Sequence, residues 1–141
     1  MDQLILCVLL AANPATVRVP AAPAKLVVSV LNAFAKLRES ENEETTLALE
    51  SALNSVFEKN TRASDEALAV LVEFYIGEHS GEDLFCELVH RGKRVLPLMK
   101  KYHRRSIVVP GMNMSRAEAL DTLYDGVVHE IRRGAHCERE S

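Results

Sequence analysis

The residues best suited by type to acid–base chemistry lie in one short acidic stretch, residues 77–83 (GEHSGED). It brings His79 close to Glu82 and Asp83, and an imidazole beside carboxylates is a common arrangement for general acid–base catalysis. No adjacent apolar residues would exclude water from these groups, as an active site requires. The favoured interpretation is a solvated turn whose acidic groups stabilise the start of the next helix, with an acidic docking knob and a His79-dependent enzyme as alternatives.

Motifs for metal binding and nucleophilic catalysis are incomplete or missing from the sequence. His129-Glu130 begins like the zinc motif HExxH, but Arg133 stands where the second histidine is needed. His136-Cys137 offers two ligands, whereas a native zinc site takes three or four. The phosphate-binding patterns GxGxxG and GxxxxGK[ST] and the nucleophile pattern GxSxG do not occur. The sequence therefore predicts no enzyme, no metal site and no cofactor.

A strongly basic segment is the most specific indication of a working surface. Residues 88–117 contain eight Lys or Arg and no Asp or Glu, in a chain whose formal net charge is −3. A basic surface of this kind steers the encounter with an acidic partner protein. The cations predicted to bind that partner are Arg91, Lys93, Arg94, Lys100, Lys101, Arg104 and Arg105.

Three interpretations of these cations stay open. They form a solvated face that pairs with acidic groups of a helix over residues 41–59, a docking surface for an acidic protein, or a site for phosphate in nucleic acid or lipid headgroups. A sequence pI near 6.0 and acidic flanking segments disfavour nucleic acid. The leading expectation is a small helical protein–protein interaction module, adaptor-like or inhibitor-like. A nucleic-acid or phosphate-binding module and a helical enzyme are the alternatives.

The first 24 residues have two interpretations. Residues 4–12 (LILCVLLAA) form an unbroken apolar run, and Ala22-Pro23-Ala24 has the small-x-small pattern of a signal-peptidase site. A cleaved signal peptide would make the protein periplasmic or secreted, although no Lys or Arg precedes the apolar run, as is usual in signals. The alternative is a short core helix or strand, followed by an irregular Pro/Ala-rich linker over residues 13–24, in a cytoplasmic protein.

The cysteines agree with export. Loss of the first 24 residues would remove Cys7 and leave Cys86 and Cys137 as an even pair. These two are the candidate disulfide, which would close a loop of about 50 residues and stabilise the fold by roughly 4 kcal/mol in the chain-entropy model. The alternative is three unrelated thiols in a reducing cytosol.

Helical spacing of apolar residues continues almost throughout the rest of the chain. Ser40, Ser64, Ser80 and Ser115 are the predicted N-caps. In the fourth helix, Gly92 lies within the apolar stripe, where a missing side chain permits close approach of another helix, and Pro97 should kink the backbone. The five predicted helices cover approximately residues 24–38, 41–59, 64–76, 81–103 and 116–133.

The fold predicted from these elements is all-α, with about five amphipathic helices packed as an antiparallel bundle or as stacked helical hairpins. The third helix is apolar nearly all round and should be the buried central one. We expect a single helical domain over residues 25–134 and a flexible tail over residues 135–141. No apolar run approaches the ~20 residues needed to span a membrane. The sequence leaves the partner and the oligomeric state open.

Overall fold

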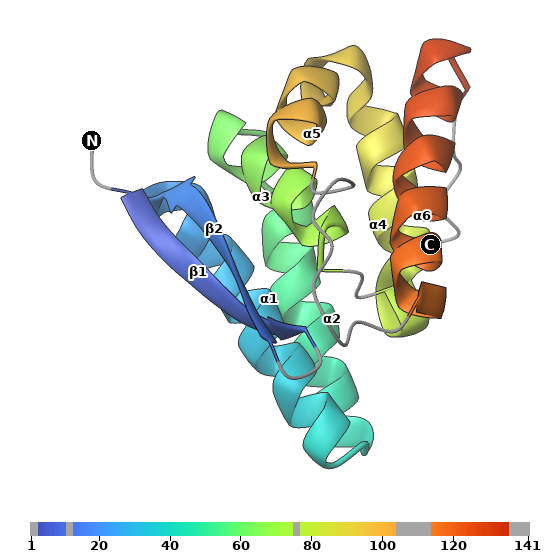
Figure 1. The fold of residues 1–141 in the computed structure, drawn as a ribbon. Helices are drawn as coiled ribbons and strands as arrows, with labels where there is room; N and C mark the ends of the chain where they lie inside the picture. Colours follow the sequence, from blue (N-terminus) through green and yellow to red (C-terminus); the bar gives the residue numbers. More distant parts are fainter. Residues whose placement is uncertain (1–2, 11–12, 75–76, 104–113, 136–141) are drawn as a thin grey trace.

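The computed structural model describes residues 3–10, 13–74, 77–103 and 114–135, and among these it describes side chains outside residues 3–17, 77–82 and 114–120. An N-terminal hairpin precedes a series of helices that makes up the rest of the described chain (Figure 1). The elements are β1 (Gln3–Leu10), β2 (Asn13–Pro20), α1 (Ala21–Glu39), α2 (Glu43–Phe57), α3 (Arg62–Val72), α4 (Gly77–Arg91), the 3₁₀ helix η1 (Gly92–Val95), α5 (Leu96–Tyr102) and α6 (Met114–Arg132).

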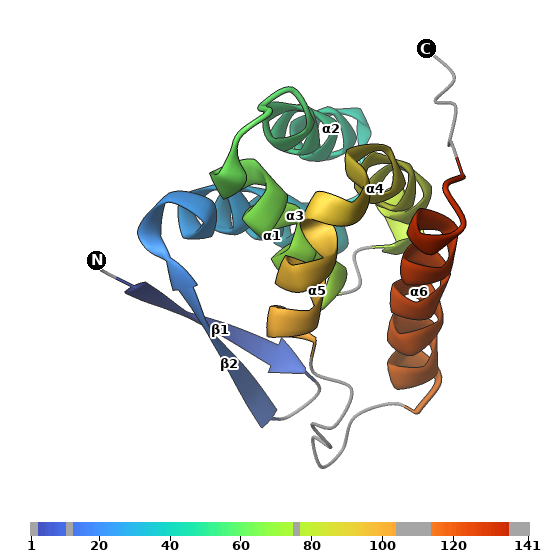
Figure 2. The same cartoon turned by 90° about the horizontal axis from the view of Figure 1, so that it is seen from above.

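The all-α expectation is confirmed for the body of the protein, where the six α-helices and one 3₁₀ helix of the described residues cover the five predicted segments. α3 packs against α1, α2, α4, α5 and α6, and every residue from position 64 to position 74 is buried. The prediction of a buried central third helix is therefore correct. The hairpin and α6 lie on opposite sides of the molecule (Figures 1 and 2).

The N-terminal hairpin is the part that sequence periodicity did not predict. β1 and β2 pair antiparallel, from Gln3 opposite Pro20 to Leu10 opposite Asn13, and both strands contact α1. Residues 13–24, predicted to be an irregular linker, instead form β2 and the first turn of α1. Prolines fit here because they lie near strand ends and in the first helical turn, where a missing N–H is tolerated. The signal-peptide interpretation of the first 24 residues stays a prediction.

The helix caps are provided by residues other than the predicted serines. Asn42 caps α2, since its Oδ1 accepts the backbone N–H of Thr45 at 2.9 Å and the Thr45 hydroxyl accepts the Asn42 N–H at 3.0 Å. Thr61 caps α3 in the same reciprocal arrangement with Ser64, which lies inside the helix. The predicted caps Ser40 and Ser64 are therefore wrong. Ser80 and Ser115 also lie inside helices, because α4 begins at Gly77 and α6 at Met114.

The predicted fourth helix is interrupted, and the interruption corrects the role assigned to Gly92. Gly92 has φ +73° and begins η1, and a Cβ added there would meet nothing within 4 Å. The glycine therefore serves a left-handed backbone turn and not a close helix contact. Pro97 lies in the first turn of α5, where its missing donor costs nothing, so the break falls upstream of the proline. The close approach occurs at Gly126 of α6, where a Cβ would lie 3.2 Å from the Phe85 ring.

Candidate functional site

Arg91, predicted to bind a partner, is instead an internal structural residue. Its side chain is 2% exposed. Nη1 donates to Asp65 Oδ1 at 2.8 Å, and Nε donates to Glu87 Oε1 at 3.1 Å. The Nη1 group also donates to the hydroxyl of Ser64. The guanidinium thus joins α4 to the first turn of α3 through the Asp65 ion pair and the Ser64 hydrogen bond, and the Glu87 ion pair holds it within α4.

The other side of the Arg91 guanidinium caps the C-terminal end of α2. Nη2 donates to the backbone carbonyls of Val56, Phe57 and Lys59 at 3.3, 3.1 and 2.9 Å. Carbonyls at a helix end have no partner within the helix, and a planar guanidinium can serve several of them at once. Arg91 therefore fixes the α2–α3 turn against α4. A sequence signal existed in the Glu87/Arg91 pair at i,i+4, but spacing alone does not tell a buried pair from an exposed one.

Two further predicted cations pair with acidic residues of α3 and still reach solvent. Arg94 Nε lies 3.1 Å from Asp65 Oδ2, and its side chain is 46% exposed. Lys101 Nζ lies 3.3 Å from Glu66 Oε1, and its side chain is 55% exposed. The expected pairing with acidic groups therefore occurs in part, but within these two pairs the carboxylates belong to α3 and not to the predicted helix over residues 41–59.

The remaining predicted cations divide into two kinds. Lys93 in η1 and Lys100 in α5 are exposed and have no ion-pair or hydrogen-bond partner in the described part of the chain. Arg104 and Arg105 lie outside the described residues. A residue that the sequence did not single out, Arg62 at the start of α3, joins the exposed cations and is likewise without a described partner.

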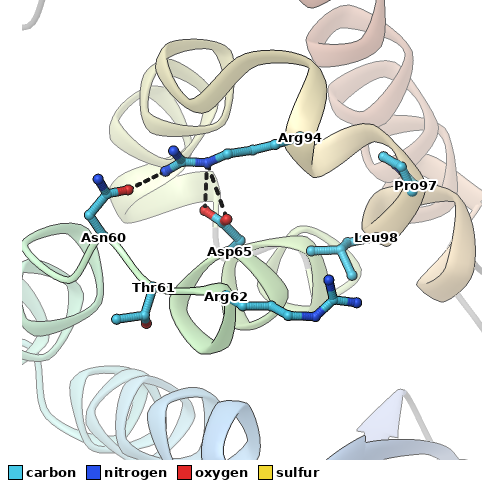
Figure 3. Close-up of a pocket in the computed structure, with 7 residues that line it drawn as sticks. All are labelled: Asn60, Thr61, Arg62, Asp65, Arg94, Pro97 and Leu98. Atoms are coloured by element: carbon cyan, nitrogen blue, oxygen red, sulfur yellow. Dashed lines mark hydrogen bonds and ion pairs between the residues drawn. The ribbon is translucent and has the colours of Figure 1, made fainter.

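A pocket of about 320 Å³ lies between the start of α3 and the η1–α5 segment. In Figure 3, Arg94 extends toward Asn60, whereas Arg62 extends in the opposite direction, toward Leu98. Asp65 lies between the two arginines, and its Oδ1 accepts a hydrogen bond from Arg94 Nε at 3.3 Å. The residues that line the pocket are Asn60, Thr61, Arg62, Asp65, Arg94, Pro97 and Leu98. A smaller hollow of about 250 Å³ also borders Asn60 and Arg94.

Glu66 forms a buried polar contact that the sequence did not reveal. It accepts hydrogen bonds from the Tyr102 hydroxyl and from Lys101, and Glu66 and Tyr102 are both buried. Burial, followed by the hydrogen bond and the charge of Glu66, raises the pKa of Tyr102 well above its ordinary value of 10.0. The contact ties the end of α5 to α3.

His103 forms a second polar contact, at the place where α3, α5 and α6 meet. Its Nδ1 lies 3.1 Å from Glu73 Oε2, and its ring stacks on Tyr124 with centroids 3.5 Å apart. Nε2 lies 3.9 Å from Asp121 Oδ1 and is buried with no hydrogen-bond partner among the described residues. A carboxylate–imidazole pair can act as an acid–base element, but His103 lines neither the pocket nor the smaller hollow described above. We assign the contact a role in packing.

The other sequence candidates are not brought together into a site. Residues 77–83 form the first turns of α4 instead of a preceding turn, and the side chains of His79 and Glu82 lie outside the described part. His129 is exposed on α6, where its neighbour Glu130 pairs with Arg133 at 2.8 Å. His136 and Cys137 lie outside the described residues. Within the described part of the chain, no group of three or more His, Cys, Asp or Glu could hold a metal ion.

Cys86 of α4 is buried and disulfide-bonded. Its partner is not among the described side chains, so the predicted pairing with Cys137 stays a prediction. Across the described residues, no helix is both long enough and apolar enough to cross a membrane.

No family model, curated protein or solved structure matches this chain. The exposed cations of α3 and of the η1–α5 segment include the two arginines that line the pocket, and we take these cations as the candidate binding surface. We call Arg62, Lys93, Arg94, Lys100 and Lys101 the basic edge.

Proposed function

We propose that this protein is a non-catalytic helical module that binds an acidic segment of a partner protein through the basic edge. The observation that carries the proposal is the exposure left after internal pairing. Arg94 and Lys101 remain 46% and 55% exposed although each has a carboxylate partner. Lys93, Lys100 and Arg62 are exposed and have no described partner.

The position of this charge supports a protein partner. Arg94, Pro97, Leu98 and Lys101 follow helical spacing, and the first three line the pocket. A charged surface that includes a concave apolar part favours a shaped ligand over a bare polyanion backbone. The chain as a whole is acidic, which disfavours long nucleic acid, because phosphates beyond the basic edge would meet like charge.

The proposal includes an exported location. The disulfide at Cys86 supports it, since disulfides persist in the periplasm and outside the cell and are rare in the cytosol. The test is thiol alkylation and intact mass of the protein purified from a bacterial host without reductant. We expect Cys86 to resist alkylation until the protein is unfolded and reduced. A free Cys86 after unfolding without reductant would contradict an oxidising location.

Binding is tested with a fluorescein-labelled, glutamate-rich decapeptide, measured by fluorescence anisotropy at about 50 mM salt. We expect the double variant Lys93→Glu/Lys100→Glu to lose at least tenfold in affinity, since both cations are exposed and have no ion-pair partner among the described residues. The matched control, Lys25→Glu/Lys36→Glu, makes the same change in net charge at exposed positions of α1 and should lose much less.

Two results would contradict docking through the basic edge. The first is an equal loss of affinity in the two double variants, which would mean that only net charge matters. The second is an absence of peptide binding by the unmodified protein at low salt. Retention on heparin without peptide binding would instead support the phosphate-binding alternative.

A further inference from the structure

We infer that the pocket between α3 and α5 recognises one acidic side chain of the partner together with an apolar side chain next to it. This inference rests on the proposed function and makes it specific. The carboxylate would bind the Arg62 guanidinium, and the apolar side chain would contact Pro97 and Leu98. The pocket is thus the part of the basic edge that selects a sequence, whereas the other cations supply general attraction.

Among the described residues, Arg62 is the pocket arginine that remains available for a ligand. Asp65 already receives Nη1 of Arg91 at 2.8 Å and Nε of Arg94 at 3.1 Å. Arg62 has no ion-pair or hydrogen-bond partner among the described residues, and its side chain extends away from Arg94 along the pocket (Figure 3). A guanidinium binds a carboxylate through two parallel N–H bonds, which makes it selective for a planar acidic group.

The pocket lining carries more positive than negative charge. Its charged members are Arg62, Arg94 and Asp65. The negative charge of Asp65 is neutralised by two ion pairs, one with Arg94 and one with the buried Arg91. A ligand carboxylate therefore meets a pocket lining with net positive charge. A ligand ammonium group would find in that lining only the Asp65 carboxylate, which is already paired.

The pocket also has a size that fits side chains. The volume of about 320 Å³ lies at the small end of the ~300–1,000 Å³ that ligand sites occupy. It suits one or two side chains and is small for a nucleotide cofactor. Pro97 is exposed and Leu98 borders the same space, so an apolar contact is available beside Arg62. An acidic residue with an apolar neighbour fits both surfaces together.

The experiment combines variants of the protein with variants of the peptide. The probe is a labelled glutamate-rich decapeptide in which one glutamate is followed by leucine. Arg62→Gln should weaken binding about tenfold or more, whereas Lys93→Gln, with the same loss of charge, should weaken it about threefold or less. Arg62→Lys should recover little of the affinity that Arg62→Gln loses, because a lysine lacks the two parallel N–H donors of a guanidinium. Circular dichroism melting checks that each variant is folded.

The peptide variants locate the effect. Changing the glutamate before leucine to glutamine should weaken binding by the unmodified protein and should have no further effect in Arg62→Gln, as a double-mutant cycle requires for a direct contact. Backbone amide NMR signals of Thr61, Arg62 and Leu98 should shift when the peptide is added.

The outcomes separate this inference from the proposed function. A peptide that binds with equal contributions from all its glutamates, with equal losses in Arg62→Gln and Lys93→Gln, would overturn the pocket inference and leave docking on the basic edge intact. No peptide binding at low salt would overturn the proposed function and the pocket's role with it. Pocket shifts caused by free succinate, with none caused by the peptide, would assign the site to a small dicarboxylate and would also overturn the inference.

Discussion

Replacing Arg91 with methionine tests the main correction that the structure makes to the sequence interpretation. Methionine keeps most of the apolar stem of arginine and removes every donor. The change breaks the ion pairs to Asp65 and Glu87 and the hydrogen bonds to the carbonyls of Val56, Phe57 and Lys59. The α2–α3 turn would lose its link to α4.

The expected cost follows from burial. The side chains of Arg91, Asp65 and Glu87 are 2%, 11% and 7% exposed, so water cannot replace the lost partner without local opening. Removing one partner of a buried ion pair typically costs about 3–5 kcal/mol. Arg94 continues to neutralise Asp65, which places the estimate for Arg91→Met near the lower value, about 3 kcal/mol. That is a large part of the ~5–15 kcal/mol that stabilises an ordinary domain.

The assay is urea unfolding followed by circular dichroism at neutral pH. Arg94→Met and Lys93→Met are the controls, since both side chains are exposed and each should cost about 1 kcal/mol or less. An Arg91→Met protein as stable as Lys93→Met would refute the reasoning. Arg91 would then be a solvent-exposed cation and not an internal structural residue.

Other predictions concern caps, backbone and pH. Gly92→Ala should lower the free energy of unfolding by about 1–2 kcal/mol through its left-handed φ, and wild-type stability in urea would contradict that conformation. Asn42→Ala should cost about 1 kcal/mol and Ser40→Ala almost nothing in thermal melts, since Asn42 caps α2. The pKa of Tyr102 is raised in the folded state, so its contribution to stability is complete below about pH 10 and declines above it. Tyr102→Phe should make that decline in melting temperature shallower, and an unchanged pH profile would contradict the contact with Glu66.

The helical part of this fold could be predicted because its cause is local. Apolar residues repeat with the period of a helix in all five segments, and the run from Ala67 to Val72 is apolar throughout, so that burial on every side was its only favourable arrangement. The caps predicted at Ser40 and Ser64 were wrong by two or three residues, because the reciprocal capping bonds are made by Asn42 with Thr45 and by Thr61 with Ser64. Both the serines and the nearby Asn42 and Thr61 are residue types that cap helices. The backbone position at which each helix begins determines which of them forms the cap.

The hairpin and the basic edge depend on contacts between distant residues. Residues 13–20 become a strand through pairing with β1, although their prolines disfavour regular structure when they are considered alone. Arg91 and Lys93 stand two positions apart in one basic run, yet one is buried and the other exposed. The sequence by itself determined that this protein is helical, that α3 is its centre and that positive charge gathers near residues 91–101. The tertiary structure decided which of those charges are internal, because a charge becomes buried only where the ends of other helices bring carboxylates and unpaired carbonyls to meet it.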